Sequence, residues 1–485
     1  MIWNNPKIKG IEMMDTGFSR RKFVQSVAGA ATLSALGLKA QGAAASVEPL
    51  RVAVLGCGIR GVSAHIAAAC EERLVAIVDP DRAAIDSALK KVRNVDPQVD
   101  LSKIKNYSDY RRMFDEMGKE LDAVIIATPN HQHALPALLA IRRGIHVYVE
   151  KPMTLTIAES RQLVAEARQY GVVTQMGQQG HIGEGCRRLC EYIWAGAIGQ
   201  VRDVYCWSNR ANGSVTGRPP SEPVPQGLNW EQWIGPAPYR DYHAGLHPHD
   251  WHDWFDFGNG SLGNMGCHIL DPAYWALKLG HPSAIELEDI FGGNAECYPV
   301  STRIRWEFPA RDGMEPVNLH WYDGLASGQP YNDKTVNFKS DCVNQAYQNR
   351  PPLVAQIEKQ YDRNLGSNGT LYVGDKGMMI TDAYGDGVRI VPEEAHRAFK
   401  KPAATLPRVK GTHQRDFFRA CRGGEPACAN FDYSGPLNEL VLLGCLAIRA
   451  GKGKRIEWDG AAMDCANLPE LNKFLKIESR SGWSC

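Results

Sequence analysis

Short apolar runs alternate with longer amphipathic stretches along the chain from residue 50 to residue 176. Each strand-length run is mainly apolar, which predicts strands buried on both faces of a sheet. Between these runs the apolar positions recur at helical spacing, most clearly over residues 157–170. This alternation predicts a doubly wound parallel sheet, with strands at 51–55, 74–78, 121–128, 145–149 and 172–176.

The pattern changes beyond residue 176, where the predicted strands are more widely spaced. They lie at 201–207, 284–290, 303–308, 317–321 and 455–458, and helices are predicted at 187–194, 414–421 and 437–450. The stretch 212–260 is rich in proline, tryptophan and histidine, and its prolines exclude long regular elements. We therefore expect two α/β domains, at 50–176 and 177–485, the second with an aromatic-rich loop at 212–260.

The composition is that of an ordinary globular protein. The 485 residues are 44% hydrophobic and 22% charged, and the formal net charge is +1. The chain therefore lacks the cationic excess that nucleic-acid binding needs. Its 13 cysteines are an odd number and form no Cys-x-x-Cys pair. Because neither the cysteines nor the histidines of 212–260 have the spacing of metal ligands, we expect buried thiols and no metal site.

The first 45 residues have the features of an export signal. Arg20 and Arg21 precede an apolar segment at 24–38, and the alanine-rich stretch 42–45 follows it. The apolar segment is shorter than the roughly 20 residues that span a bilayer. The paired arginines before Phe23 resemble the twin-arginine signal, which implies a periplasmic protein without a stable membrane anchor. The alternative is an N-terminal helix of the folded domain.

A glycine-rich turn follows the first predicted strand and opens a helix. Asp79 ends the second strand about twenty residues later, and this combination is the dinucleotide-binding fingerprint of a Rossmann domain. The Asp79 carboxylate suits ribose hydroxyls and repels a 2′-phosphate, so we expect NAD, with NADP less favoured. The alternative role for Asp79 is a helix N-cap before Pro80. Gly56 allows the tight turn, Gly58 lets the backbone approach the pyrophosphate, and Gly61 permits close helix–strand packing. The turn residues expected at the cofactor are Gly56, Gly58, Ile59, Arg60 and Gly61.

Polar clusters also follow the later strands. The carboxyl ends of parallel strands are where an open α/β sheet binds its ligands. We therefore expect further cofactor contacts from Thr128, Pro129, Asn130, His133, Glu150, Lys151 and, at the crossover to the second domain, Gln178.

Two segments resemble the Gfo/Idh/MocA oxidoreductases, the family of glucose–fructose oxidoreductase and inositol dehydrogenase. The first is Glu150-Lys151-Pro152, with the polar stretch 128–133 before it, and the second is the glycine-rich stretch 258–271. The resemblance extends from about residue 50 to about residue 459. It implies that the second domain is built on a large open mixed sheet, often used for oligomer contacts, and we therefore expect a homo-oligomer.

The resemblance also implies catalytic roles. The family's lysine falls on Lys151 and its proton-transferring histidine on His268, whereas its aspartate falls on Asn264, which cannot raise the imidazole pKa as a carboxylate would. Oxidation of a secondary alcohol suits a histidine for the proton and an ammonium for the developing alkoxide. We expect Glu150 to pair with that ammonium or to contact the nicotinamide side. The alternatives are a structural histidine near a helix start and a surface lysine, and Asp271 is expected to cap a helix.

Aromatic faces in the loop suit the apolar C–H surface of a pyranose ring. We expect substrate contacts from Lys151, Trp251, His252, Asn264 and His268, although the loop can equally pack over the sheet without binding a ligand. The resulting hypothesis is a periplasmic oxidoreductase that transfers a hydride between non-dissociating NAD and a secondary hydroxyl of a sugar, glycoside or polyol. Two alternatives stay open. They are a redox-neutral NAD-assisted glycosidase or epimerase, which the intact Glu-Lys-Pro disfavours, and a non-catalytic dinucleotide-binding protein.

Overall fold

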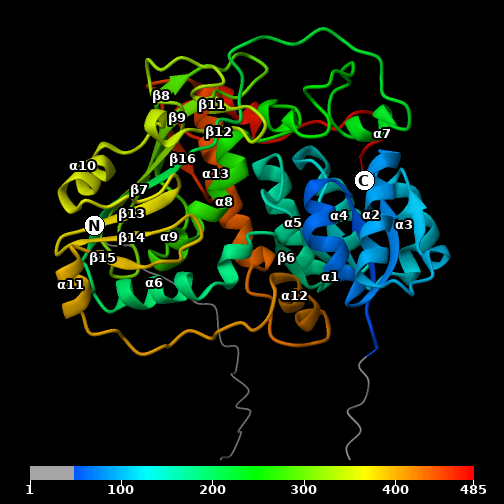
Figure 1. The fold of residues 1–485 in the computed structure, drawn as a ribbon, viewed down its shortest axis with the longest axis horizontal. Helices are drawn as coiled ribbons and strands as arrows, with labels where there is room; N and C mark the ends of the chain where they lie inside the picture. The colour runs from blue at the N-terminus through cyan, green and yellow to red at the C-terminus, as the bar shows by residue number, and fades with distance from the viewer. Residues whose placement is uncertain (1–47, 485) are drawn as a thin grey trace, which may run out of the picture. The chain divides into compact units, whose positions relative to one another are not determined.

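The computed structural model describes residues 48–484, so the expected signal at 1–45 lies outside the described residues. The first domain is a six-stranded parallel sheet in the order β3-β2-β1-β4-β5-β6 (Figure 1), which confirms the predicted sheet, although the pattern identified five of its strands and missed β3. Its strands are β1 (Arg51–Leu55), β2 (Arg73–Val78), β3 (Lys105–Tyr107), β4 (Ala123–Ile126), β5 (His146–Val149) and β6 (Thr174–Met176).

Helices connect these strands. They are a π-helical turn at Gly61–His65, α1 (Ile66–Cys70), α2 (Arg82–Val95), α3 (Tyr110–Met117), α4 (Ala134–Ile141) and α5 (Ile157–Tyr170). Helix α5 has the predicted bounds because both ends carry local signals. Thr156 and Glu159 form a capping box at its start, and Gly171 ends it in the left-handed conformation, with φ 63°.

The second domain is built on a nine-stranded mixed sheet, in the order β15-β14-β13-β7-β10-β9-β8-β16-β17. Strands β7 and β10 pair in parallel and their neighbours are antiparallel. The sequence pattern identified five of these strands but not β13, β14, β15 or β17. The bounds are β7 (Val201–Ser208), β8 (Ala284–Phe291), β9 (Ser301–Phe308), β10 (Val317–Gly324), β13 (Gly369–Gly374), β14 (Met378–Thr381), β15 (Arg389–Val391), β16 (Arg455–Asp459) and β17 (Asp464–Cys465), with a separate hairpin of β11 (Val336–Asn337) and β12 (Cys342–Val343).

One face of this sheet is covered by helices. Its other face carries ion pairs such as Arg305 with Glu286 and Glu288, both at 2.9 Å. The homo-oligomer implied by the resemblance stays a prediction. Among residues 48–484, no helix combines the length and the apolar character needed to cross a membrane. The helices of this half are α6 (Glu184–Trp194), α7 (Trp230–Ile234), α8 (Gly260–Ile269), α9 (Asp271–Ala276), α10 (Pro352–Tyr361), α11 (Glu393–Ala398), α12 (His413–Cys421) and α13 (Phe431–Ala450).

The late helices α12 and α13 tie the two halves together. Phe417 and Phe418 of α12 lie in the same apolar cluster as Val52 and Val54 of β1, so a segment far along the chain completes the first domain. Helix α13 packs on α5 and also on α8 and β8, and Figure 1 shows it running between the two sheets. Helix α12 therefore packs with the first domain, although the sequence analysis assigned every residue after 176 to the second domain.

Buried Asn438 of α13 holds the loop that follows Lys151. Its Oδ1 accepts a hydrogen bond from the Met153 backbone N–H at 2.9 Å, and its Nδ2 donates to Thr154 Oγ1 at 3.0 Å. Because both partners are buried, water cannot replace either bond. The side chain therefore fixes the backbone directly after the lysine.

We expect Asn438→Ala to lower the free energy of unfolding by about 1–3 kcal/mol, because a buried N–H and a buried hydroxyl lose their partner. Denaturant unfolding of the full chain measures this loss. Asn467→Ala is the matched control, since Asn467 also makes one accepting and one donating bond but is exposed. An equal loss in both variants would contradict the role assigned to Asn438.

Candidate functional site

A cleft of about 850 Å³ lies along the carboxyl ends of the first sheet's strands. It extends from Asp79 and helix α2 to Lys151 and His268, and residues of the second domain form its other wall. Apart from Gly61 and Gln178, every residue predicted to bind cofactor or substrate lines this cleft. These residues are Gly56, Gly58, Ile59, Arg60, Asp79, Thr128, Pro129, Asn130, His133, Glu150, Lys151, Trp251, His252, Asn264 and His268.

The glycines of the first turn have separate geometric roles. Gly56 has φ 87°, and a Cβ there would lie 2.5 Å from the Ala127 backbone. A Cβ at Gly61 would lie 2.0 Å from the Gly56 carbonyl oxygen, so this glycine allows close packing and does not face the cleft. A Cβ at exposed Gly58 would meet no protein atom within 4 Å. The turn therefore leaves open space where the fingerprint places a diphosphate.

Asp79 lies at the α2 end of the cleft. Its carboxylate accepts hydrogen bonds from the N–H groups of Cys57, at 2.7 Å, and Asp81, at 2.8 Å. Burial raises the pKa of Asp79 to about 6, against the lowering effect of these bonds. The N-cap of α2 is Asp81, which accepts from the Ala83 N–H at 2.9 Å, so the helix-cap alternative for Asp79 is wrong.

Residues 227–247 of the aromatic-rich loop, which we name the strap, cross onto the first domain beside Asp79. The Asn229 N–H donates to the Pro80 carbonyl at 2.8 Å, and the Arg82 N–H donates to the Gly227 carbonyl at 3.0 Å. His247 Nε2 lies 3.0 Å from an Asp81 oxygen. Figure 1 shows this green segment passing from the second domain to α7 above α2. The strap thus borders the α2 end of the cleft with a histidine and a tryptophan, His247 and Trp233.

Glu150 at the end of β5 is bound by groups other than the neighbouring ammonium. Its Oε1 lies 2.8 Å from His65 Nε2 and accepts hydrogen bonds from Gln179 at 2.8 Å and Arg60 at 3.3 Å. Burial alone would raise the pKa of Glu150, but the His65 hydrogen bond and the surrounding cations hold it well below its usual value. The expected pairing of Glu150 with the Lys151 ammonium is therefore wrong, because the carboxylate points to His65.

The Lys151 ammonium instead reaches across the cleft to α8. Nζ donates to the Asn264 backbone carbonyl at 2.6 Å and to Asn264 Oδ1 at 3.2 Å. Asn264 Nδ2 donates to Asn212 Oδ1 at 2.8 Å, which fixes the orientation of the amide. Burial lowers the pKa of Lys151, and the charge of Glu150 opposes that effect. Two neutral oxygens therefore hold a lysine whose ammonium form is destabilised.

His268 lies in the last turn of α8, shortly before α9 begins at Asp271, and it is not a satisfied structural histidine. Its Nδ1 is buried without a hydrogen-bond partner, and its ring packs edge-on against Tyr384 at 5.1 Å. Burial and the Lys151 charge lower the pKa of His268 to about 3. The imidazole is therefore neutral at neutral pH.

Several predicted roles are corrected by the side-chain positions. Gln178 lies outside the cleft, because its Nε2 donates to Ser434 Oγ at 2.9 Å, and the adjacent Gln179 lines the cleft instead. Asp271 is not the cap of α9: its carboxylate lies 3.0 Å from His181 Nδ1 and accepts from the Tyr433 hydroxyl at 2.6 Å. These neighbours come from distant parts of the chain.

Some cleft residues bind other parts of the protein. The two ring nitrogens of His133 lie 2.8 Å and 2.7 Å from the carbonyl oxygens of Pro152 and Thr128, and Asn130 Nδ2 donates to Asn259 Oδ1 at 2.9 Å. They therefore hold the cleft's walls together. The prediction also missed Arg210 and Tyr384, which line the cleft without any local motif.

Comparison with known proteins identifies both domains. Residues 50–178 match the Gfo/Idh/MocA oxidoreductase family model for an NAD-binding Rossmann fold, and residues 201–317 match the model for its C-terminal alpha/beta domain. The chain has the two domains of the Gfo/Idh/MocA oxidoreductase family. The NAD-binding domain is the one that contains the glycine turn and Asp79.

Among Gfo/Idh/MocA relatives, D-glucoside 3-dehydrogenase of Escherichia coli is 27% identical over 32% of this chain and 42% of its own length. Glycosyl hydrolase family 109 protein 1 of Shewanella sp. (strain MR-4) is 30% identical over 33% of this chain and 34% of its own. The chain thus matches less than half the length of either relative. The WlbA dehydrogenase of Bordetella pertussis, solved with NADH and UDP-GlcNAcA, shares the fold, with 14% identity, a TM-score of 0.55, and 85% of this chain and 99% of that chain covered.

The cleft of this Gfo/Idh/MocA chain fits NAD. Gly58 leaves room beside the turn, and the Asp79 carboxylate disfavours a 2′-phosphate at the α2 end. Lys151 and His268 lie at the opposite end, where the fold presents its second ligand.

We expect Asn264→Asp to raise the pKa of His268 by about 1–3 units, because the new carboxylate would lie one helical turn before the imidazole. NMR titration of the ring resonances, assigned with His268→Ala, measures the shift. In the wild type His268 should not titrate between pH 8 and pH 5, whereas the variant's midpoint should move toward that range. A midpoint that does not change would show that the two side chains are uncoupled.

Proposed function

We propose that the chain oxidises a secondary hydroxyl of a sugar, glycoside or polyol, or reduces the corresponding ketone. The observation that carries this proposal is the placement of Lys151 and His268 in the same cleft as the glycine turn. Bound NAD supplies the hydride acceptor or donor. The protein must then hold the hydroxyl and move its proton.

Lys151 is the better proton acceptor of the two. Burial lowers the pKa of Lys151 from its high usual value, whereas it lowers the pKa of His268 to about 3. A catalytic base works best when its pKa lies near the working pH, so His268 is too weak a base for this task. We therefore assign the proton to Lys151 Nζ and the orientation of the hydroxyl to the neutral imidazole of His268.

The substrate end of the cleft is lined by aromatic and polar groups. Trp251 stacks on His252 with ring centroids 3.7 Å apart, and both line the cleft with Arg210. Such a wall offers apolar contact to the C–H face of a sugar ring and donors to its hydroxyls. The E. coli relative named as a glucoside dehydrogenase supports the same substrate class.

A redox-neutral reaction is the second candidate, favoured by the Shewanella relative named as a glycosyl hydrolase. Such an enzyme would release product with no net change in reduced nicotinamide. The two candidates separate in one assay, in which the purified protein is mixed with a panel of sugars and glycosides. Absorbance of the reduced nicotinamide and the released product are both followed.

We also propose that NAD stays bound and that the protein works in the periplasm. The paired arginines before Phe23 motivate the compartment, which has no evident pool of free NAD. The strap supports retention, since its contacts with Pro80, Asp81 and Arg82 lie beside the α2 end of the cleft. Opening that end requires these bonds to break.

Lys151→Met should lower turnover on a confirmed substrate by about 10²–10⁴-fold, because it removes both the proton acceptor and the charge beside the oxygen. NAD binding, followed by quenching of tryptophan fluorescence, should persist. Lys410→Met, an exposed change outside the cleft, is the control. Full turnover of the Lys151 variant would refute the assignment, and a wild type that binds NAD but acts on no sugar would favour a non-catalytic binding protein.

Wild-type protein should keep NAD through gel filtration, and His247→Ala should speed its release by about tenfold, equivalent to 1.4 kcal/mol. The reason is the loss of the His247–Asp81 contact that holds the strap. His320→Ala is the matched control, because His320 also pairs with an aspartate, Asp203 at 3.2 Å, but lies outside the cleft. Equal release rates in the two variants would show that the His247–Asp81 contact does not retain the cofactor.

A further inference from the structure

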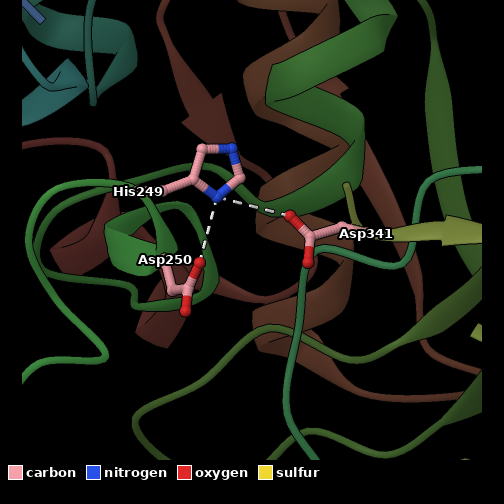
Figure 2. Close-up of side chains that lie close together, drawn as sticks. All are labelled: His249, Asp250 and Asp341. Atoms are coloured by element: carbon pink, nitrogen blue, oxygen red, sulfur yellow. Dashed lines mark hydrogen bonds and ion pairs between the residues drawn. The ribbon is translucent and has the colours of Figure 1, made fainter. Parts of the chain in front are cut away.

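A second group of titratable side chains lies at the rim of the cleft, separate from Lys151 and His268. It consists of His249, Asp250 and Asp341, and Figure 2 shows both carboxylates pointing toward one imidazole nitrogen. His249 Nδ1 lies 3.0 Å from Asp250 Oδ1 and 3.6 Å from Asp341 Oδ2. Among residues 48–484, this is the one such group of three whose ligand atoms all lie within 4.8 Å of one another.

These distances fit ligands that share one ion. Two atoms bound to Zn²⁺ at about 2.0–2.1 Å in tetrahedral geometry are roughly 3.3 Å apart. The two measured distances, 3.0 Å and 3.6 Å, lie on either side of that value. Figure 2 shows His249 and Asp250 on one loop and Asp341 on a different segment, so the group is assembled by the fold.

Two further polar atoms next to the group have no partner. Asp253 Oδ1 is buried without a hydrogen bond, and the charges of Asp341 and Asp250 act on this carboxyl. His252 Nδ1 is also buried without a partner, and its ring lies 5.6 Å from that of His249. Buried polar atoms are normally satisfied by protein, water or an ion. An unsatisfied carboxylate oxygen beside the carboxylates of Asp250 and Asp341 is an environment that an added cation would stabilise.

We infer that His249, Asp250 and Asp341 bind a divalent transition-metal ion. One imidazole nitrogen with carboxylate oxygens is a donor set that suits Zn²⁺ or Mn²⁺. Because Asp250 and His249 are partly exposed, the ion keeps coordination positions open toward solvent and the cleft. The site uses none of the residues assigned to the proposed hydride transfer.

The site is connected to the catalytic lysine through two amides. Asp341 Oδ2 accepts from Asn212 Nδ2 at 2.9 Å, and Asn212 Oδ1 accepts from Asn264 Nδ2 at 2.8 Å. Asn264 in turn accepts from Lys151 Nζ. A bound ion therefore orients Asp341 and, through it, the amides that hold the lysine. Since His249 lines the cleft, an open position on the ion also places a substrate oxygen at this rim.

The full chain, freed of metal by dialysis against EDTA, is titrated with Mn²⁺ while the free ion is followed by electron paramagnetic resonance. We expect one saturable site per chain, from which Zn²⁺ displaces Mn²⁺. Asp250→Asn and Asp341→Asn should each weaken binding by at least about tenfold. Asn is suited to position 341 because it tolerates the left-handed backbone there, where φ is 51°.

Asp203→Asn is the matched control, because Asp203 pairs with His320 but belongs to no three-residue group. Its binding should equal that of the wild type, and thermal melting confirms that each variant is folded. If Asp341→Asn does not fold, Asp250→Asn still tests the site, since the Asp250 side chain is half exposed. No saturable binding in the wild type, or wild-type affinity in Asp250→Asn, would overturn the inference, whatever reaction the cleft performs.

Discussion

The contact between the Lys151 ammonium and Asn264 is the interaction on which the site depends. It joins the end of β5 to helix α8, and so it brings the first sheet's ligand edge against the second domain. Both acceptor oxygens are neutral, so the ammonium keeps no carboxylate partner on that side. Burial then lowers the pKa of the lysine, whereas a carboxylate at position 264 would stabilise its charged form.

The neighbouring Glu150 does not cancel this effect, because its charge is engaged elsewhere. His65, Arg60 and Gln179 hold the Glu150 carboxylate, and they come from the helix after the glycine turn and from the crossover. The cofactor end and the substrate end of the cleft are thus connected through one carboxylate. A change in the glycine turn that moved Arg60 would alter the electrostatic environment of Lys151 without touching it.

The sequence predicted those features whose signals are local. Helix α5 has its predicted bounds because Thr156, Glu159 and Gly171 determine its ends, and the glycine turn lies where its motif requires it. Prediction failed where distant segments meet. Strand β13 pairs with β7, more than 160 residues earlier, and β14 and β15 extend the sheet from β13. Helix α12 packs under a sheet formed far upstream. The same limit explains why the predicted cofactor contact of Gln178 was wrong. Only the folded crossover shows that the adjacent residue, Gln179, lines the cleft.

The expectation of no metal site rested on spacing along the chain. Spacing cannot show that His249 and Asp341 come together, because some ninety positions separate them. The structure also suggests why the group lies there. The family's carboxylate at position 264 is an amide in this chain, and the Asn264–Asn212 link leads from that amide to the carboxylate of Asp341. Negative charge is thus present at the cleft rim, two hydrogen bonds from the lysine, and not directly beside it. A cation at the rim would then change the electrostatic environment of Lys151 through the oriented dipoles of the two amides. This coupling is weaker and more adjustable than a direct ion pair.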